Sequence, residues 1–327
     1  AGWTGQPLVI REGGEVFLIQ GSLSHHLRKI RARDGHVVWS TSLGDAIKGT
    51  PTFVDVGGKD PDKRYILMTG SRMGFETNFY KGPAYSLSGV SYTTGEILWR
   101  HNVIRTHSNS RDVDASPLMI GKKACVPLEN GYFTVFSPDP SKARQRDGVM
   151  APKIYHQSLL YRIKDTEVFG SELSCEGSPT LYRGKAYLAA GCGRVYACST
   201  GFGGIRWMLD VGGDLNSTMP LTNDACLLLG VEKQFISGRG GVMKIKPGDG
   251  VEWYYPLPDV RFFEWRGGLV GSAAVNHRYS SGITKDLACF VGVDGTLTVI
   301  NHRLTQSGVT VPGPRNEKRY PTPLVLD

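Results

Sequence analysis

One feature of this 327-residue chain constrains its fold more than any other: a short motif recurs along almost its whole length. Each copy places a Ser or Thr and then a Pro, or a close variant of this pair, before a short apolar run. The copies start at Gln6-Pro7, Thr50-Pro51, Ser116-Pro117, Ser178-Pro179, Thr218-Met219-Pro220 and Thr322-Pro323, and residues 271–275 fit the register without the Pro. From Pro7 to Pro323 the spacing averages about 53 residues, which predicts an array of small repeated units.

The order of elements inside each unit is repeated as well. After the apolar run come a second strand, a glycine-containing turn, a third strand, another glycine turn and a fourth strand. Residues 64–68 with 84–90, and 186–190 with 193–198, show the period-two alternation and the β-branched and aromatic content of paired strands. No segment carries a helical stripe of apolar residues, so the predicted fold class is all-β.

Four of the six Trp occupy one position in the predicted fourth strand, shortly after a glycine turn. They are Trp39, Trp99, Trp207 and Trp253. A glycine supplies the positive φ of a hairpin turn, and a Trp near the outer edge of a sheet can bury a large flat surface against the neighbouring sheet. These four Trp are therefore predicted to be structural.

The pattern resembles the quinoprotein-type, or PQQ-like, β-propeller repeat, whose blades read Ser-Pro and an apolar strand, two further strands, and then Thr-Gly-x-x-x-Trp. The resemblance covers about residues 6 to 326 and is strongest in 49–99 and 177–207. It implies a β-propeller of four-stranded blades. In repeat type and approximate size the chain is also similar to the propeller lipoprotein of the bacterial outer-membrane barrel-assembly machinery.

The repeat units are predicted to begin near residues 6, 49, 115, 177, 217 and 271 and to form a single domain over residues 1–327. Six blades are the favoured count. Residues 322–326 are predicted to begin a seventh first strand, which either completes the closure of the disc or belongs to a further blade, so seven blades are the alternative.

The charge balance narrows the classes of partner. The 38 basic and 30 acidic side chains give a net charge of +8, but the basic residues are scattered without a long run, as on an ordinary solvated surface. No nucleic-acid partner is therefore expected. No stretch approaches the roughly 18 consecutive apolar residues of a transmembrane segment.

The start at Ala1, without a Met or a leader, fits either a mature exported protein or a trimmed chain, and we expect a periplasmic or extracellular location. The six Cys lack the paired spacing of a zinc site. Buried free thiols and one or two disulfides, with Cys192 and Cys198 nearest in sequence, both fit their pattern.

In this type of repeat, the loop from each fourth strand to the next first strand crosses one face of the disc towards the central funnel. Loops on a rigid scaffold commonly carry binding groups, and converging carboxylates can share a cation. The ligand or cation candidates in the central funnel are Arg111, Asp112, Asp114, Glu176, Asp214 and Arg266. Ion pairing between the carboxylates and neighbouring Arg side chains is the structural alternative.

Two loops mix aromatic and charged side chains, the composition that is enriched in protein-binding hot spots. The partner-contact candidates are Phe75, Phe79, Tyr80, Phe262, Phe263 and Trp265. The alternative is that these rings pack across the top of the central channel.

The sequence predicts no catalytic residue, because no segment positions a nucleophile, a phosphate loop or a metal-ligand set. The favoured function is a non-catalytic scaffold that binds other proteins through propeller loops or a blade edge in an extracytoplasmic assembly. This function requires no cofactor. The alternative, implied by the resemblance to quinoprotein dehydrogenases, is an enzyme-like propeller that uses PQQ and calcium, or another small-ligand-binding propeller with its site on the central axis.

Overall fold

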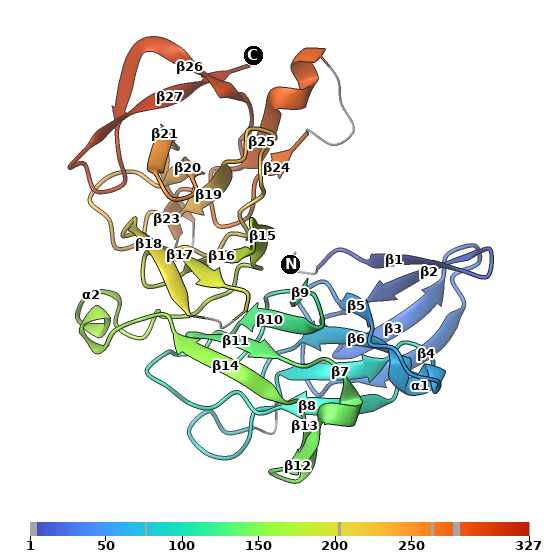
Figure 1. The fold of residues 1–327 in the computed structure, drawn as a ribbon. Helices are drawn as coiled ribbons and strands as arrows, with labels where there is room; N and C mark the ends of the chain where they lie inside the picture. Colours follow the sequence, from blue (N-terminus) through green and yellow to red (C-terminus); the bar gives the residue numbers. More distant parts are fainter. Residues whose placement is uncertain (1–4, 76, 202–203, 263–264, 277–281, 327) are drawn as a thin grey trace. The chain divides into compact units, whose positions relative to one another are not determined.

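The computed structural model describes residues 5–75, 77–201, 204–262, 265–276 and 282–326. The chain forms two compact units: unit 1 is the chain up to Leu159 together with residues 200–203, and unit 2 is the remainder. Each unit is built of small antiparallel sheets (Figure 1). The predicted all-β fold class is therefore confirmed.

Unit 1 contains three four-stranded sheets. The first is β1 (Leu8–Glu12), β2 (Glu15–Gln20), β3 (His26–Arg31) and β4 (Val37–Ser42); the second is β5 (Thr52–Asp55), β6 (Tyr65–Gly70), β7 (Leu87–Ser91) and β8 (Ile97–His101); the third is β9 (Leu118–Ile120), β10 (Lys123–Pro127), β11 (Tyr132–Phe136) and β14 (Ile154–Leu159). The third repeat carries a polar insertion, residues 137–152, which forms a separate hairpin, β12 (Arg144–Arg146) and β13 (Val149–Ala151). Two single-turn helices, α1 (Pro61–Arg64) and η1 (Pro140–Lys142), complete this unit.

Unit 2 repeats the plan. Its sheets are β15 (Thr180–Tyr182), β16 (Lys185–Ala190), β17 (Arg194–Ser199) and β18 (Ile205–Asp210); β19 (Leu227–Val231), β20 (Gly241–Lys246) and β21 (Gly250–Pro256); and β24 (Ala274–Val275), β25 (Leu287–Val291), β26 (Leu297–Pro312) and β27 (Arg319–Val325). In the three-stranded sheet a single bridge, Leu221 to Leu227, stands where a first strand is expected. A small hairpin, β22 (Asp259–Phe262) and β23 (Trp265–Gly267), and the short helices η2 (Ile163–Asp165) and α2 (Thr166–Phe169) lie between the sheets in the chain, whereas η3 (Gly282–Asp286) lies between β24 and β25 of the last sheet. None of the helices in the described parts of the chain is long and apolar enough to cross a membrane.

Burial separates the inner and outer strands of each sheet. The two central strands β6 and β7 are buried along almost their whole length, whereas the outer strands β4 and β18 alternate between half-buried and exposed positions. This pattern arises because a central strand is covered on both faces by neighbouring sheets, while an outer strand keeps one face in water. Each unit has its own hydrophobic core, in two clusters.

The recurrent Ser/Thr-Pro motif has a physical role in joining neighbouring sheets. In unit 1 the Thr50 amide donates to the Ser116 hydroxyl (3.1 Å). In unit 2 the Ser178 amide donates to Thr218 Oγ1 (2.9 Å), and the Thr218 amide donates in turn to Ser272 Oγ (2.9 Å). In these three pairs the hydroxyl of one copy thus satisfies a backbone donor of the preceding copy, which a residue without a hydroxyl would leave open.

Three of the four repeated Trp also connect sheets through hydrogen bonds. Trp39 donates to the Tyr92 carbonyl (3.0 Å), Trp99 to the Pro138 carbonyl (2.9 Å) and Trp253 to the His302 carbonyl (2.9 Å), each on the next sheet of the same unit. Trp207 packs beside the Tyr187 ring on its own sheet. In all four sheets the register shifts by one residue beside the Trp. Such a bulge bends the strand and re-aims a side chain, here towards the neighbour.

One prediction about the end of the repeat is wrong. Residues 322–326 do not begin a seventh first strand: residues up to Val325 belong to β27, which pairs with β26 as the fourth strand of the last sheet, with Val325 opposite Ile300 and Leu324 opposite Asn301. The 16-residue β26 extends far beyond its partner β25, and its length supplies the edge on which β27 pairs. A Thr-Pro followed by an apolar run fits an outer strand as well as an inner one, because Pro is tolerated on an edge.

Candidate functional site

The first aromatic loop predicted from the sequence, residues 73–81, lies between β6 and β7 in unit 1 and is called the aromatic loop below. Phe75 and Tyr80 are 72% and 67% exposed, the two highest values among the described large hydrophobic side chains. Phe75 lies 4.8 Å from the His25 ring, and Phe79 meets Tyr80 edge-on at 5.2 Å. The Arg105 guanidinium lies over the Tyr80 ring at 4.5 Å. The loop thus presents rings to solvent beside a cation.

Two of the ligand candidates hold this loop in place. Arg111 is only 2% exposed; its Nε donates to the Val103 carbonyl (2.7 Å), and its two terminal nitrogens donate to the carbonyls of Phe79 (3.3 Å) and Gly82 (3.1 Å). Asp112 accepts from the Met73 amide (3.0 Å) at the start of the loop. Both residues therefore fix the backbone of the aromatic loop, and their polar groups are engaged within the protein.

The two acidic ligand candidates of unit 1, Asp112 and Asp114, each pair with a basic side chain. Arg72 donates to Asp112 (3.2 Å), and Lys48 pairs with Asp114 through a short contact. Burial, and then the Asp114 charge, raise the pKa of Asp112, while the Asp112 charge raises the pKa of Arg72. Asp112 and Asp114 are thus each paired with a cation of the protein, although Asp114 Oδ1 has no hydrogen-bond donor among the described residues, and their role as cation ligands stays a prediction.

The candidates of unit 2 have different surroundings. Asp214 is 6% exposed, and burial together with the charges of Glu232, Glu176 and Glu172 raises its pKa well above the usual range. Its Oδ1 has no hydrogen-bond donor among the described residues, and the same holds for Oδ1 of Asn216. A buried carboxylate oxygen without a donor is costly, so Asp214 either keeps a proton or shares a positive charge.

Several oxygens gather at this point, which we call the Asp214 niche (Asp214, Asn216 and Glu232, with Gly191 at its wall). Asn216 Nδ2 donates to Glu232 (3.0 Å). A Cβ placed on Gly191 would lie 3.1 Å from Asp214 Oδ1 and 3.0 Å from the Ser174 carbonyl oxygen, so only Gly leaves this space open. Glu176 accepts from the Ser174 hydroxyl (3.1 Å). Of the ligand candidates, the structure brings Asp214 and Glu176 together in unit 2, and Arg111, Asp112 and Asp114 in unit 1.

The second aromatic segment is only partly described. Trp265 lies half-buried in β23, where it pairs with Phe262 of β22, and Arg266 is exposed. No hydrogen bond or ion pair to Arg266 is found within the described ranges. Phe263 and the side chain of Phe262 lie outside the described residues, so these two partner-contact candidates remain predictions.

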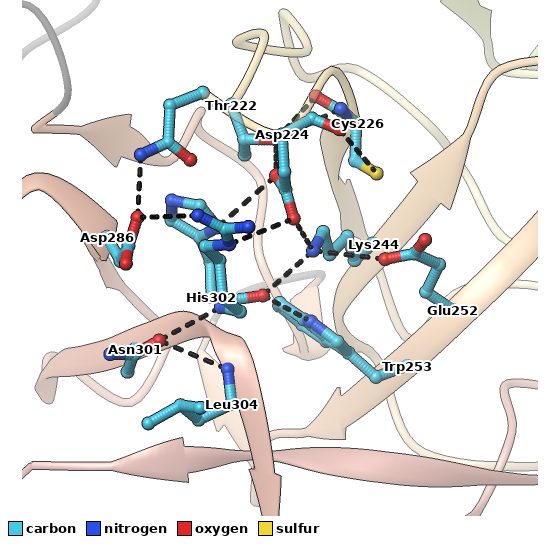
Figure 2. A network of polar contacts seen from close by, with 12 residues as sticks. Thr222, Asp224, Cys226, Lys244, Glu252, Trp253, Asp286, Asn301, His302 and Leu304 are labelled. Carbon is cyan, nitrogen blue, oxygen red and sulfur yellow. Dashed lines mark hydrogen bonds and ion pairs between the residues drawn. The ribbon is translucent and has the colours of Figure 1, made fainter.

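The sequence did not reveal one buried polar cluster, shown in Figure 2. Asp224, Cys226 and Glu252 place one potential ligand atom each within 4.8 Å of one another. The ammonium of Lys244, whose side chain is 2% exposed, lies 2.6 Å from Asp224 and 3.0 Å from Glu252 and also donates to the His302 carbonyl (3.0 Å). This ammonium supplies the positive charge that a metal would bring, so the cluster is a buried ion network.

The protonation states in this network argue against catalysis. Burial lowers the pKa of Lys244, but its hydrogen bonds to Asp224 and Glu252 outweigh burial and raise it. Burial raises the pKa of Cys226 to about 12 and lowers the pKa of the fully buried His302. A charged lysine and a protonated thiol are poor nucleophiles. The signal in the sequence was a Lys at an inward position of the apolar strand β20.

Two further thiols are as unreactive as that of Cys226. None of the six Cys belongs to a disulfide, so Cys192 and Cys198 are not joined to each other. Burial raises the pKa of Cys192 to about 11 and that of Cys198 to about 12.

Comparison with known proteins identifies the fold. No family model matches the chain, and no curated protein matches its sequence. Among solved structures, the crystal structure of BamB from Moraxella catarrhalis is similar, with a TM-score of 0.58 and 14% identity, over 90% of this chain and 72% of that one. An identity this low carries the fold and nothing of the function. The repeated antiparallel sheets and this likeness together show that the chain has the β-propeller fold.

Proposed function

We propose that the protein is a non-catalytic propeller that binds another protein through the aromatic loop of unit 1 and acts as a scaffold in an extracytoplasmic assembly. The observation that carries this proposal is the exposure of Phe75 and Tyr80 on a loop whose backbone is fixed from beneath by Arg111 and Asp112. Exposed aromatic side chains of this kind are the usual anchors of protein interfaces.

The anchoring matters energetically. A loop that is ordered before binding pays less conformational entropy when the partner arrives, so more of the buried aromatic area contributes to affinity. Arg105, which lies over Tyr80, adds a side chain type that is enriched in hot spots. A protein with an aromatic or acidic patch is the matching kind of partner.

The cellular setting is part of the proposal. The likeness to BamB supports an extracytoplasmic protein. The repeated sequence pattern supports a single domain in which the six repeats form one propeller. The free thiols neither add to this proposal nor oppose it.

The test is a site-specific photocrosslinker at position 80 in the native host, followed by reconstitution with the captured protein. We expect one stoichiometric partner, and at least a tenfold loss of affinity in the Phe75→Ala/Tyr80→Ala double variant. Tyr155→Ala, which removes an exposed ring from β14 in the same unit, is the matched control and retains affinity. Equal affinity in both variants would refute the aromatic loop as the contact.

The Asp214 niche favours a second candidate function, the binding of a cation or of a small ligand with its cation, as in the quinone-and-calcium alternative. The supporting observation is the pair of buried oxygens without donors, on Asp214 and Asn216. Asp214, Asn216 and Glu232 would hold Ca²⁺, which takes carboxylate and amide oxygens and would supply Lewis acidity there. Thermal denaturation with Ca²⁺, alone and with PQQ, tests it: a Tm increase that Asp214→Asn abolishes supports this candidate, and an unchanged Tm refutes it.

A further inference from the structure

A small cavity in unit 1 lies beneath the hairpin that the polar insertion forms. β13 packs alongside β8, the outer strand of the second sheet, and the two lie side by side in Figure 1. The space between them, of about 150 Å³, is lined by Arg100 and His101 of β8, Arg146 of β12, and Ile154 of β14, among others.

The hairpin is fixed over this cavity by its turn. Asp147, at a φ of 51°, and Gly148, at 83°, form the left-handed turn that joins β12 to β13. The Tyr85 hydroxyl donates to the Asp147 carbonyl in a short contact, and Asn102 Nδ2 lies 3.5 Å from the Asp147 carboxylate. These two contacts hold the turn of the hairpin in a defined position over the cavity.

The lining carries basic side chains without partners. Arg100, His101 and Arg146 make no side-chain hydrogen bond or ion pair with any described residue, and Asp147 is the single carboxylate of the lining. Burial lowers the pKa of Arg100. Burial, and then the charge of Arg146, lower the pKa of His101 to about 4. Arg100 and His101 are thus half-buried beside the exposed Arg146, and Asp147 is the one carboxylate that faces these three basic side chains, so an acidic ligand would offset positive charge that Asp147 alone does not.

We infer that this cavity binds a carboxylate carried on a short apolar chain. An arginine guanidinium matches a carboxylate in a two-bond fork, and the remaining walls, which include Ile104, Val149 and Pro152, suit methylene groups. The volume is about that of a cavity that holds benzene, so a group of roughly six heavy atoms fits. Phosphate, hydrated on all sides, does not match the apolar walls.

The carboxylate has two possible sources: a free dicarboxylate, or the side chain of a glutamate on another protein. The inference does not depend on the proposed function, because a free dicarboxylate would fill the cavity without any protein partner. Both sources present the same group to Arg146 and His101, and the experiment separates them.

Binding is expected to be coupled to the protonation of His101. The charged and titratable groups facing this imidazole are Arg146 and Asp147 from the hairpin, Arg100 from its own strand and Tyr85 from the segment before β7; β14 contributes the neutral Gln157. A bound carboxylate offsets the Arg146 charge and favours the imidazolium. By linkage, the ligand raises the pKa of His101 from about 4, and its affinity increases as the pH falls, down to the range near about 4.3 in which the ligand carboxylate itself takes up a proton.

The experiment is calorimetric titration of the intact chain with glutarate, N-acetyl-glutamate amide and inorganic phosphate, with the His101 ring followed by NMR. We expect glutarate to bind, Arg146→Gln to weaken binding at least tenfold, and His101→Gln to remove the part of the pH dependence that lies above the titration of the glutarate carboxyls at about 4 to 5. Arg144→Gln removes the same charge from the same strand outside the cavity and is expected to bind as the unaltered chain does.

The outcomes are distinguishable. Binding of both carboxylates supports the inference with a protein glutamate as a possible source, and binding of glutarate alone supports it with a free dicarboxylate. The inference is overturned if neither binds, if phosphate binds as tightly as glutarate, or if the Arg144 and Arg146 variants lose affinity equally. Thermal denaturation of each variant verifies folding, and the chemical shift of His101 reports occupancy independently of affinity.

Discussion

At the scale of single residues, the buried charges of unit 2 divide into two kinds. Lys244 has two carboxylates and a carbonyl around its ammonium, whereas Asp214 has carboxylates around it and an oxygen without a donor in the described part of the chain. In the first arrangement, the stability of the folded state depends on the Lys244 ammonium and both of its carboxylate partners. The second makes stability depend on whether a proton or a cation neutralises Asp214.

Replacing Lys244 by Met tests the first arrangement. The variant removes the ammonium that Asp224 and Glu252 share and leaves Asp224 with Arg303 at 4.0 Å. Because both carboxylates are partly exposed, we expect a loss of about 3 kcal/mol or less in the free energy of unfolding, the lower end for a buried ion pair that loses one partner. Urea denaturation measures the change. Lys246→Met, on the same strand but in an exposed pair with Asp249, is the control and is expected to unfold at an unchanged urea concentration. Equal effects of the two substitutions would contradict a special role for the buried ammonium.

Asp214 gives a pH dependence of defined sign. Its pKa is raised in the folded chain, so the folded state binds the proton more tightly than the unfolded state, and stability falls as the pH rises from about 4 through the folded pKa. Asp214→Asn removes this proton exchange. We therefore expect the Tm advantage of Asp214→Asn over the unaltered chain to grow with rising pH, measured without divalent cations. Tm curves that run parallel from pH 4 to pH 8 would show that Asp214 is ionised as freely in the folded state as in the unfolded state.

At the scale of elements, the turn of one sheet is shaped by the Trp of the preceding sheet. Gly95 has a φ of +79°, and a Cβ there would lie 2.8 Å from the Trp39 ring and 2.9 Å from the Thr41 hydroxyl. The Thr41 hydroxyl also donates to the Gly95 carbonyl (2.6 Å). A glycine is thus required at position 95 for two reasons: the turn needs a positive φ, and the Trp39 ring leaves no room for a Cβ.

Gly95→Ala is therefore expected to destabilise the chain more than its φ alone accounts for. Gly57 has nearly the same φ, +81°, and a Cβ at that position would meet nothing within 4 Å, so Gly57→Ala isolates the backbone cost of about 1 to 2 kcal/mol. We expect Gly95→Ala to cost at least about 1 kcal/mol more in urea denaturation, because the Trp39 ring must move. Similar losses in both variants would mean that the ring adapts freely.

The same scale shows what could be predicted from the sequence. The strand order, the repeated position of the Trp and the aromatic composition of the loop could be predicted, because period-two patterning, turn glycines and residue content are local properties. The anchoring roles of Arg111 and Asp112 could not, because they depend on carbonyls and amides that the fold brings from other parts of the chain. Residues 322–326 were misplaced because their local pattern is the same in an inner and an outer strand, and only pairing with the long β26 decides.

At the scale of the whole molecule, the proposed single propeller implies that all six repeats unfold cooperatively. Each unit has its own core clusters, yet the proposal joins all six repeats in one domain. If they form one propeller, heat unfolds them together, because each sheet is buried by its neighbours.

Differential scanning calorimetry of the intact chain tests this directly. We expect one transition whose calorimetric and van't Hoff enthalpies agree, and a single shift of that transition in the Lys244→Met variant of unit 2. Two resolved transitions, with only the one assigned to unit 2 moved by the substitution, would refute a single cooperative domain.

The hydroxyl relay between repeats has a consequence for how such a chain can change length. Thr218 accepts from the amide of the repeat before it and donates its own amide to the hydroxyl of the repeat after it, so this copy carries one connector of each kind. Duplication or deletion of a whole copy built in this way would leave the count of donors and acceptors unchanged. A deletion that begins within a copy strands one of them, which favours growth and shrinkage of the gene by complete copies.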